Sequence, residues 1–302
     1  MALPRLLIIG HGYVGSVLAR QFVEAGFPVT AVNRSAESGL PYPVLPGDVS
    51  SLESVRPLAS SFAAGGPDLI VHCASSSRGG PDAYRSVFID GLKNLHATFP
   101  GVPVIFTSSS SVYGQIDGSI VDEQSEAAPD RETSRLLCEA EQITREAGGI
   151  ALRLAGIYGP GRSVHVKKML EGTATIDEGE VSRYLNQIHR DDAAAAIRHL
   201  ATVGADHFRG RLFNVVDNTP LTQRECYEGL STILGLPLPP EAPPELDRKR
   251  AWTNKIVSNA ALRETGWSPL YPSFLDAVQH DTCLVSSIRE SIEADQELSS
   301  PA

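Results

Sequence analysis

Three glycines near the N-terminus have the spacing of a loop that holds the diphosphate of a dinucleotide. Gly10, Gly12 and Gly15 form the pattern G-x-G-x-x-G directly after the apolar run 6–9. In such a loop the first glycine allows a tight turn, the second lets the backbone approach the phosphates, and the third lets the next helix pack closely. The free N–H groups and positive dipole end of that helix then face the anion. The sequence therefore predicts a dinucleotide site, with an unliganded glycine-rich turn as the alternative.

Four consecutive hydroxyl side chains, Ser108 to Ser111, follow a second apolar run at 102–107. Ligands of open α/β sheets bind at the carboxyl ends of the strands. A serine at this edge could hold a substrate oxygen, so the run is a candidate for the site of chemistry. The alternative is an ordinary serine-rich turn.

The end of the expected second strand bears on the choice of cofactor. Enzymes that select NAD usually carry an acid there, which binds the ribose 2′-hydroxyl. This chain has Asn33, Arg34 and Ser35 instead. Because an arginine can pair with a 2′-phosphate, the expected cofactor is NADP, and all three residues are expected to contact it. The alternative is that Arg34 is a solvated loop cation and the cofactor is NAD.

Strand-like and helix-like patterns alternate through the first half of the chain. This alternation predicts βαβ units on a parallel sheet. Six strands are expected, one of them just before Gly47, and together they give an α/β fold with a doubly wound parallel sheet, the Rossmann fold. The other five strands are expected at 6–9, 28–33, 68–74, 102–107 and 150–154, and helices after the glycine loop and at 52–64, 82–99 and 132–147.

The second half is less regular and is expected to build a lid over the carboxyl ends of the strands. We expect the Rossmann domain to span 1–157, with 185–217 returning to it, and a substrate-binding lid to span 158–184 and 218–285. A polar tail at 286–302 is expected to fray. Within these segments the sequence predicts helices at 191–203, 222–234 and 258–265, a strand at 211–216, a capping box of Thr222 with Glu225, and a stiff extended linker at 237–244.

Composition excludes several classes of protein. The net charge of −10 would repel the phosphate backbone of nucleic acid. The N-terminal apolar run is far shorter than the roughly 18 residues of a membrane span, and it is expected to be the first strand rather than a signal peptide. The cysteines Cys73, Cys138, Cys226 and Cys283 form no CxxC pair, so neither zinc nor another metal nor a disulfide framework is expected. A reducing cytoplasmic location fits these features.

Several motifs in a fixed order give the chain a family resemblance. It resembles an extended short-chain dehydrogenase/reductase of the epimerase/dehydratase branch over nearly its whole length, and its glycine spacing points to the atypical members. The motifs are GHGYVG (10–15), GDV (47–49), HCAS (72–75), TSSSSVYG (107–114), LRLAGIYGPGR (152–162), IHRDD (188–192) and FNVV (213–216).

The resemblance implies roles for residues along the sheet edge. Asp48 stands where the family's aspartate binds the adenine, with a solvated turn residue as the alternative. Ser109 matches the catalytic serine, and Ser110 is expected to contact substrate. The further expected cofactor contacts are Tyr13, Val14, Cys73, Ala74, Ser75 and Arg135.

The chain departs from the family at its usual acid and base. Family members carry Tyr-x-x-x-Lys at the start of the long helix, where this chain has Arg131 and Arg135. An arginine, whose pKa lies above about 12, cannot exchange protons near neutral pH. Tyr113 and His165 are the candidate replacements. The alternatives are a packing role for Tyr113 and a hydrogen-bonded surface role for His165.

These features predict an NAD(P)-dependent oxidoreductase or epimerase that acts on a small polar substrate, such as a sugar or sugar nucleotide. Arg131, Arg153 and Arg162 are expected to bind an anionic group of that substrate. His189 with Asp192 is expected to be scaffolding, with an aspartate capping the following helix. The resemblance also implies a homodimer that pairs through helices 82–99 and 132–147. The alternative function is a non-catalytic NAD(P)-binding sensor.

Overall fold

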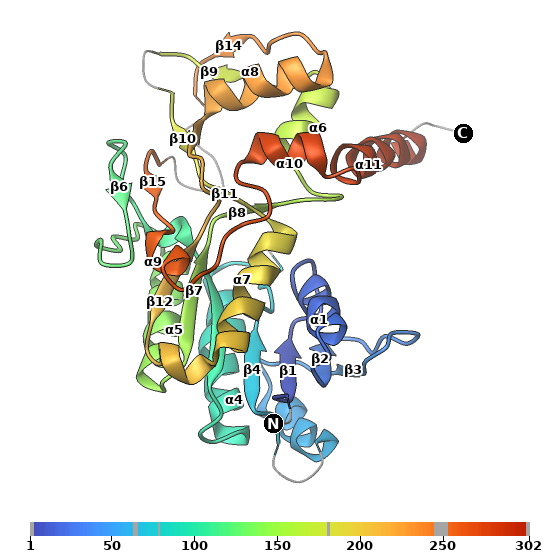
Figure 1. The fold of residues 1–302 in the computed structure, drawn as a ribbon, viewed down its shortest axis with the longest axis vertical. Coiled ribbons are helices and arrows are strands. Elements are labelled where there is room, and N and C mark those ends of the chain that lie inside the picture. Colours follow the sequence, from blue (N-terminus) through green and yellow to red (C-terminus); the bar gives the residue numbers. More distant parts are fainter. Residues whose placement is uncertain (1–2, 63–65, 78, 180–181, 245–252, 300–302) are drawn as a thin grey trace.

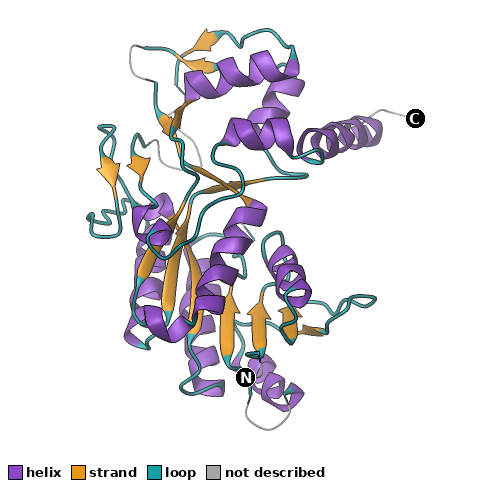
Figure 2. Cartoon of the chain, viewed as in Figure 1, coloured by secondary structure: helices purple, strands orange, loops and turns teal. Residues whose placement is uncertain are grey.

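Seven parallel strands form the central sheet of the computed structural model, which describes residues 3–62, 66–77, 79–179, 182–244 and 253–299. Their order across the sheet is β12-β7-β5-β4-β1-β2-β3 (Figures 1 and 2). The chain order reverses between β1 and β4, which makes the sheet doubly wound. The strands are β1 (Leu6–Ile9), β2 (Val29–Asn33), β3 (Val44–Pro46), β4 (Leu69–His72), β5 (Val104–Ser109), β7 (Ile150–Leu154) and β12 (Leu212–Val215).

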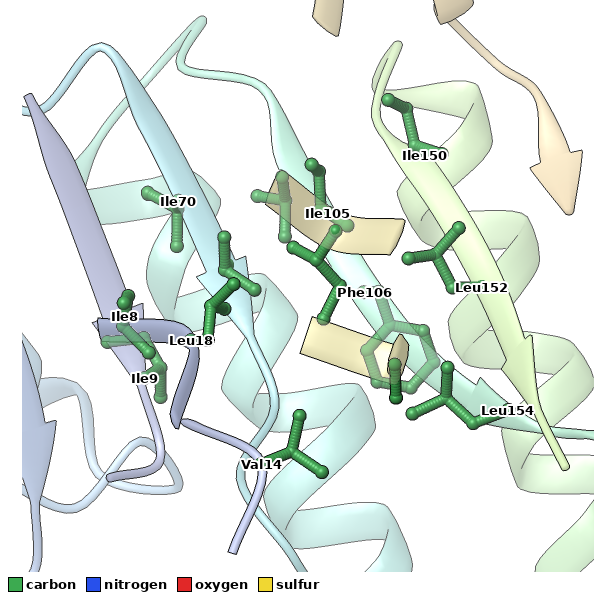
Figure 3. Close-up of a cluster of buried hydrophobic side chains, with 14 of the residues drawn as sticks. Ile8, Ile9, Val14, Leu18, Ile70, Ile105, Phe106, Ile150, Leu152 and Leu154 are labelled. Carbon is green, nitrogen blue, oxygen red and sulfur yellow. The ribbon is translucent and has the colours of Figure 1, made fainter. Parts of the chain in front are cut away.

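The strands form where the sequence has short apolar runs. Every side chain of β1, β4 and β7 is buried, as expected of a parallel sheet covered on both faces. Figure 3 shows Leu18, from the helix that follows β1, beside Ile8 of β1, and Phe106 of β5 near Leu154 of the neighbouring β7. The predicted fold class, a doubly wound parallel sheet, is confirmed.

Helices cover both faces of the sheet (Figure 1). One face carries α1 (Gly15–Glu24) and α7 (Arg190–Val203), and the other carries α4 (Gly91–Thr98) and α5 (Glu132–Glu146). The expected helix at 82–99 is α3 (Pro81–Tyr84), a π-helical segment (Arg85–Asp90) and α4 in succession. The expected helix at 52–64 is α2 (Leu52–Val55) followed by a 3₁₀ segment (Arg56–Ser61).

A second hydrophobic cluster lies beyond the carboxyl ends of the strands (Figure 1). It is built mainly by α6 (Val164–Leu170), α8 (Gln223–Leu234), α10 (Phe274–His280) and α11 (Leu284–Ser299). Four short strand pairs lie near and beyond the carboxyl end of the sheet, and α9 (Ala260–Arg263) packs against β12. The pairs are β8 (Gly156–Tyr158) with β11 (Gln187–His189), β10 (Tyr184–Leu185) with β13 (Leu221–Thr222), β9 (Ile176–Asp177) with β14 (Glu241–Ala242), and β6 (Ile120–Val121) with β15 (Ile256–Val257).

The end of the chain differs most from expectation. The described part of the predicted fraying tail at 286–302 is helical, because Leu284 and Ile288 lie four residues apart on one face and are buried. Lys167 of α6 also pairs with Asp295 at 3.0 Å. Tertiary contacts therefore order a segment whose composition is polar.

Smaller differences concern the upper part. The linker predicted at 237–244 is extended, but it also adds β14 to β9. The helix predicted at 258–265 is shorter, since α9 spans four residues. The capping box of Thr222 with Glu225 is confirmed, with both reciprocal hydrogen bonds present. Among the helices of the described part, none combines the length and apolar character that a bilayer span requires.

Candidate functional site

The glycine loop between β1 and α1 has two packed glycines and one open glycine. Gly10 has a φ of +99°, and a Cβ there would lie 2.5 Å from the backbone of Ala74. A Cβ on Gly15 would lie 1.9 Å from the carbonyl oxygen of Gly10. A Cβ on Gly12 would meet nothing within 4 Å. Val14, at the N-cap of α1, makes no side-chain capping hydrogen bond. This arrangement fits a dinucleotide diphosphate, which needs a tight turn and an accessible backbone.

The end of β2 carries a carboxylate that the sequence did not point to. The loop after β2 folds back so that Glu37 Oε1 accepts a hydrogen bond from Asn33 Nδ2 at 3.0 Å. The guanidinium of Arg34 extends instead toward the loop after β4, where it donates to Ser77 Oγ at 3.1 Å. Ser35 is exposed. An acid thus lies beside Asn33, four residues later in the chain than a motif search would place it.

The same carboxylate reaches the glycine loop. Nδ1 of His11 lies 3.0 Å from Glu37 Oε1, and Nε2 of His11 lies 3.0 Å from the Tyr42 hydroxyl. The His11 and Asn33 hydrogen bonds lower the pKa of Glu37, with His11 as the largest cause. Glu37 therefore remains an anion that ties the glycine loop to the end of β2.

The ends of β3 and β4 carry the other residues that the sequence assigned to the cofactor. Asp48 is exposed and accepts hydrogen bonds from the backbone and the hydroxyl of Ser50, which is an Asx turn. Cys73 Sγ donates to Gly10 O at 3.3 Å, and burial raises the thiol pKa to about 12, so this side chain is a packing element. Ser75 Oγ accepts from the Ser77 amide. Cofactor contacts at Asp48, Cys73, Ala74 and Ser75 stay predictions.

A short turn at the end of β5 presents the candidate serines. Ser109 is the last residue of the strand, and its Oγ accepts from the Ser111 amide, which caps a 3₁₀ turn over Ser110–Val112. Ser109 and Ser110 are half-buried. The hydroxyl of Ser134, on α5, lies 3.4 Å from the Ser111 carbonyl oxygen. The serine turn is thus held from its own strand and from α5, while Ser109 keeps a partly exposed side chain.

Tyr113 lies in the interior and does not have the geometry of a proton donor to substrate. It is fully buried, its hydroxyl donates to the Asp122 carbonyl oxygen at 2.6 Å, and it lies 3.0 Å from Asn214 Oδ1. Burial raises its pKa. The packing role that the sequence left open therefore fits, and the geometry argues against the predicted catalytic role.

Arg153 is also buried rather than aimed at a ligand. Its guanidinium pairs with the Glu141 carboxylate at 2.7 Å, both side chains being at most 6% exposed, and lies 4.7 Å from the Tyr113 ring centroid. The hydroxyl of Ser108 donates to the same carboxylate. Because Glu141 already neutralises this arginine in the core, the predicted contact of Arg153 with substrate is not supported.

The two arginines that replace the family's tyrosine and lysine lie at the start of α5. Arg131 is the N-cap residue and is half-buried. Arg135 is exposed and donates to the Asp130 carbonyl oxygen at 3.1 Å. Both lie in the same turn at the start of α5 as Ser134, which contacts the serine turn. Their contacts with substrate and cofactor stay predictions.

A cluster of one aromatic and two cationic side chains adjoins the glycine loop. The Tyr13 hydroxyl donates to the Pro160 carbonyl oxygen at 3.1 Å. The guanidinium carbons of Arg162 and Arg190 lie 5.2 and 5.0 Å from its ring centroid. Burial raises the Tyr13 pKa to about 12, although both arginines act to lower it. Two cations therefore lie near the expected diphosphate site, and Arg190 was not a sequence candidate.

His165 lies within the second hydrophobic cluster. Its Nδ1 is 3.2 Å from the Tyr227 hydroxyl, and its ring packs edge-on against Tyr227 and Phe274. It therefore faces helices of the upper part rather than the serine turn. This geometry argues against the predicted catalytic role of His165.

His189 and Asp192 both make structural contacts, as expected, but His189 rather than an aspartate caps the helix. His189 itself caps α7, since its Nδ1 accepts from the Asp191 amide, and its Nε2 lies 3.1 Å from Asp281 Oδ2. Asp192 instead accepts from the amides of Leu270 and Tyr271. Burial lowers the His189 pKa and raises the Asp192 pKa to about 6. The expectation that an aspartate caps this helix is wrong, because the histidine ring already occupies that amide.

Comparisons with known proteins agree with this fold. The model of the NAD dependent epimerase/dehydratase family matches residues 6–215. Protein YeeZ of Escherichia coli (strain K12) is 28% identical over 280 residues, which cover 89% of this chain and 97% of that protein. A structure from Methylobacillus flagellatus, provisionally described as an NAD-dependent epimerase/dehydratase, is 28% identical with a TM-score of 0.77, covering 95% of this chain and all of its own. The UDP-glucose 4-epimerase of Thermus thermophilus, in complex with NAD, shares the fold at 19% identity and a TM-score of 0.74, covering 94% and 99%.

Proposed function

We propose that this chain, which belongs to the NAD dependent epimerase/dehydratase family, is an oxidoreductase or epimerase that acts on a small polar substrate such as a sugar or sugar nucleotide. The observation that carries the proposal is the shared position of Gly12 and Ser109. Gly12 follows β1 and Ser109 ends β5, both at the carboxyl edge of the sheet. In the sheet, only β4 lies between these two strands. A cofactor diphosphate on the first and a substrate oxygen on the second would therefore lie along one edge.

In this proposal, different residues would bind the cofactor and hold the substrate. Gly12 and the N-terminus of α1 would hold the diphosphate, with Arg162 close enough to add positive charge, whereas Arg190 already pairs with Asp191 at 2.9 Å. The bound nicotinamide would supply or accept a hydride. Ser109 would hold the oxygen of the reacting carbon. Because Tyr113 and His165 are packed elsewhere, the proton would be exchanged with water or the substrate, while Arg131 would attract an anionic group of that substrate.

Replacement of Ser109 by alanine is expected to lower kcat/KM by about 10²-fold, because a hydrogen-bond donor to the reacting oxygen is lost. The measurement is steady-state turnover of a substrate identified by following NADH and NADPH fluorescence across ketosugars and sugar nucleotides. Ser111→Ala is the matched control, since that exposed residue uses its backbone amide in the turn. Equal activity of the Ser109→Ala variant and the wild type would remove Ser109 from the mechanism.

The second candidate function is a non-catalytic sensor of the dinucleotide. The replacement of tyrosine and lysine by Arg131 and Arg135 favours it, because neither arginine can exchange a proton near neutral pH. The same titrations separate the two functions. Saturable binding of NADH or NADPH without turnover of any sugar or sugar nucleotide would support the sensor.

The cofactor we propose is NAD rather than the NADP predicted from sequence. That prediction assumed that no acid follows β2, whereas the Glu37 carboxylate lies against Asn33 and His11. An anion there would accept a hydrogen bond from a ribose 2′-hydroxyl and repel a 2′-phosphate. Arg34, which supported NADP, extends toward Ser77.

Replacement of Glu37 by glutamine is expected to raise the affinity for NADPH relative to NADH by about tenfold, the size of effect that 1.4 kcal/mol gives. The reason is that the amide keeps the shape of the side chain and removes its charge. Kd values for both cofactors are measured by fluorescence titration. Glu24→Gln, which changes an exposed acid on α1, is the control. An unchanged ratio of the two Kd values would refute the role of Glu37.

We also propose the domain division, dimer and location expected from sequence. Two hydrophobic clusters support a Rossmann domain of 1–157 with 185–217 and a lid of 158–184 and 218–285, to which α11 now adds its buried face. Within the proposed lid range, Val257, Leu262 and Trp267 pack in the first cluster. A homodimer through α4 and α5 is tested by sedimentation. A cytoplasmic location accords with the four scattered cysteines.

A further inference from the structure

One buried cation of the described residues has no carboxylate partner. Lys255, just before β15, is 4% exposed. Its Nζ donates to the Tyr113 carbonyl oxygen at 2.8 Å and to Thr253 Oγ1 at 3.0 Å. Among the ion pairs of the described residues, none includes Lys255. Burial alone lowers its pKa to about 8.

Such a lysine is unfavourable for folding at neutral pH. Removing an ammonium from water without a carboxylate beside it disfavours the charged form. A long apolar side chain would fill the same space without that penalty. A buried charged group that lowers the stability of the fold is a candidate functional residue, because groups with shifted pKa values cluster at functional sites.

The carbonyl that Lys255 holds belongs to the serine turn. Tyr113 closes this turn, because its amide donates to the Ser110 carbonyl oxygen at 3.2 Å. Ser109 caps the beginning of the same turn, and Ser134 contacts it from α5. Lys255 is thus the third side chain that fixes the backbone carrying Ser109, after those of Ser109 and Ser134. It lies 142 residues after Tyr113 in the chain.

The segment around Lys255 also joins the serine turn to the upper part of the molecule. On one side, the Asn254 amide donates to the Gln115 carbonyl oxygen, and Asn254 O accepts from Gly118. On the other side, Asn254 Oδ1 accepts from the Tyr184 amide, and Asn186 Nδ2 donates to Lys255 O. Tyr184 begins β10, and β15 itself pairs with β6. Lys255 therefore lies where the serine turn meets the strands that lead to the second hydrophobic cluster.

The titratable groups on the elements packed against Lys255 have other partners. In the chain that leaves the serine turn, Asp117 binds Ser119, Asp122 binds Ser125, and Glu123 accepts from the Asn214 amide. Beside β10, Arg183 pairs with Asp177. The Tyr113 hydroxyl points away to Asp122 O, whereas Lys255 binds the Tyr113 backbone.

We propose that Lys255 is a positioning residue of the active site, which fixes the Ser109 turn from the upper part of the molecule. The effect of Lys255 on turnover rests on the proposed function, whereas the hydrogen bond by which it fixes the turn does not. The ammonium strengthens the hydrogen bond to the Tyr113 carbonyl, because a charged donor binds an oxygen more tightly than a neutral one.

Replacement of Lys255 by methionine is expected to loosen the turn while leaving the protein at least as stable at pH 7. Hydrogen exchange of the amides at 110–114 is expected to accelerate at least tenfold. For a substrate found by the screen, kcat is expected to fall at least tenfold with KM and the NADH Kd unchanged. Arg56→Met, at an exposed arginine of the 3₁₀ segment after α2, is the control for the loss of charge.

The pH dependence of stability separates this role from a structural one. Between about pH 8 and pH 10.5, the unfolded chain keeps the proton on Lys255 that the folded chain has released. The free energy of unfolding of the wild type therefore rises with pH in this window relative to that of Lys255→Met. The comparison is made by urea unfolding at pH 7, 8, 9 and 10.5.

Two outcomes would overturn the proposal. One is a Lys255→Met variant that is less stable than the wild type at pH 7, since the lysine would then serve stability. The other is unchanged exchange at 110–114. Failure of the proposed function has a different signature, namely wild-type protein that binds no NADH or NADPH or turns over no substrate, whatever the exchange result.

Discussion

Replacement of Arg153 by methionine is expected to lower the free energy of unfolding by about 3–5 kcal/mol, the usual cost of removing one partner of a buried ion pair. The change leaves the Glu141 carboxylate almost fully buried and opposite an apolar side chain. The hydrogen bond from Ser108 satisfies only part of that carboxylate. Urea unfolding at pH 7 measures the difference. A loss below about 1 kcal/mol would mean that water reaches Glu141 in the folded state.

Two further variants show whether the loss comes from the unpaired charge. Arg209→Met removes an arginine whose partner Asp206 is exposed, and a surface pair of this kind contributes at most about 1 kcal/mol. The double variant Arg153→Met with Glu141→Leu replaces the whole pair by apolar groups. It is expected to recover most of the stability, because both desolvated charges are gone.

Replacement of Gly15 by alanine is expected to lower the free energy of unfolding by about 3–5 kcal/mol, in the range that indicates severe overpacking. The new Cβ would lie 1.9 Å from the Gly10 carbonyl oxygen, which belongs to the backbone and cannot turn aside. Either α1 must move away from β1 or the loop must open. Urea unfolding and circular dichroism follow this change.

Gly12→Val is the matched variant, and it separates binding from folding. Its Cβ meets nothing within 4 Å, so the free energy of unfolding without cofactor is expected to change by less than about 0.5 kcal/mol. The branched side chain would occupy the space of the diphosphate, so the Kd for NADH is expected to rise at least 100-fold. Tight binding of NADH by Gly12→Val would show that the dinucleotide lies elsewhere.

The sheet could be predicted from sequence because its signals are local. The run 6–9 is apolar throughout, and 150–154 is apolar except for Arg153, a pattern that a strand buried on both faces needs. The capping box at Thr222 could also be predicted, because its two partners are only three residues apart in the sequence. The helical tail was missed because the contact of Leu284 and Ile288 with α6 depends on a segment more than 100 residues earlier.

The site was predicted less completely, because burial and partners are set by the fold. Nothing in the sequence near Arg153 says that Glu141 will neutralise it inside the core. Glu37 reaches Asn33 only because the loop after β2 turns back. Lys255 meets the serine turn across 142 residues of chain. Motifs identify residue types at a site, whereas these contacts decide which of them face a ligand.

The loop that follows β8 joins the glycine loop to α11. Pro160 accepts from Tyr13 of the glycine loop, and the neighbouring Gly161 amide donates to Ser287 Oγ of α11 at 2.7 Å. A ribosome synthesises the glycine loop long before α11, so this set of contacts cannot close until α11 has been made. The sheet could assemble on the nascent chain before then. The contacts around the loop after β8 are therefore completed later than the sheet.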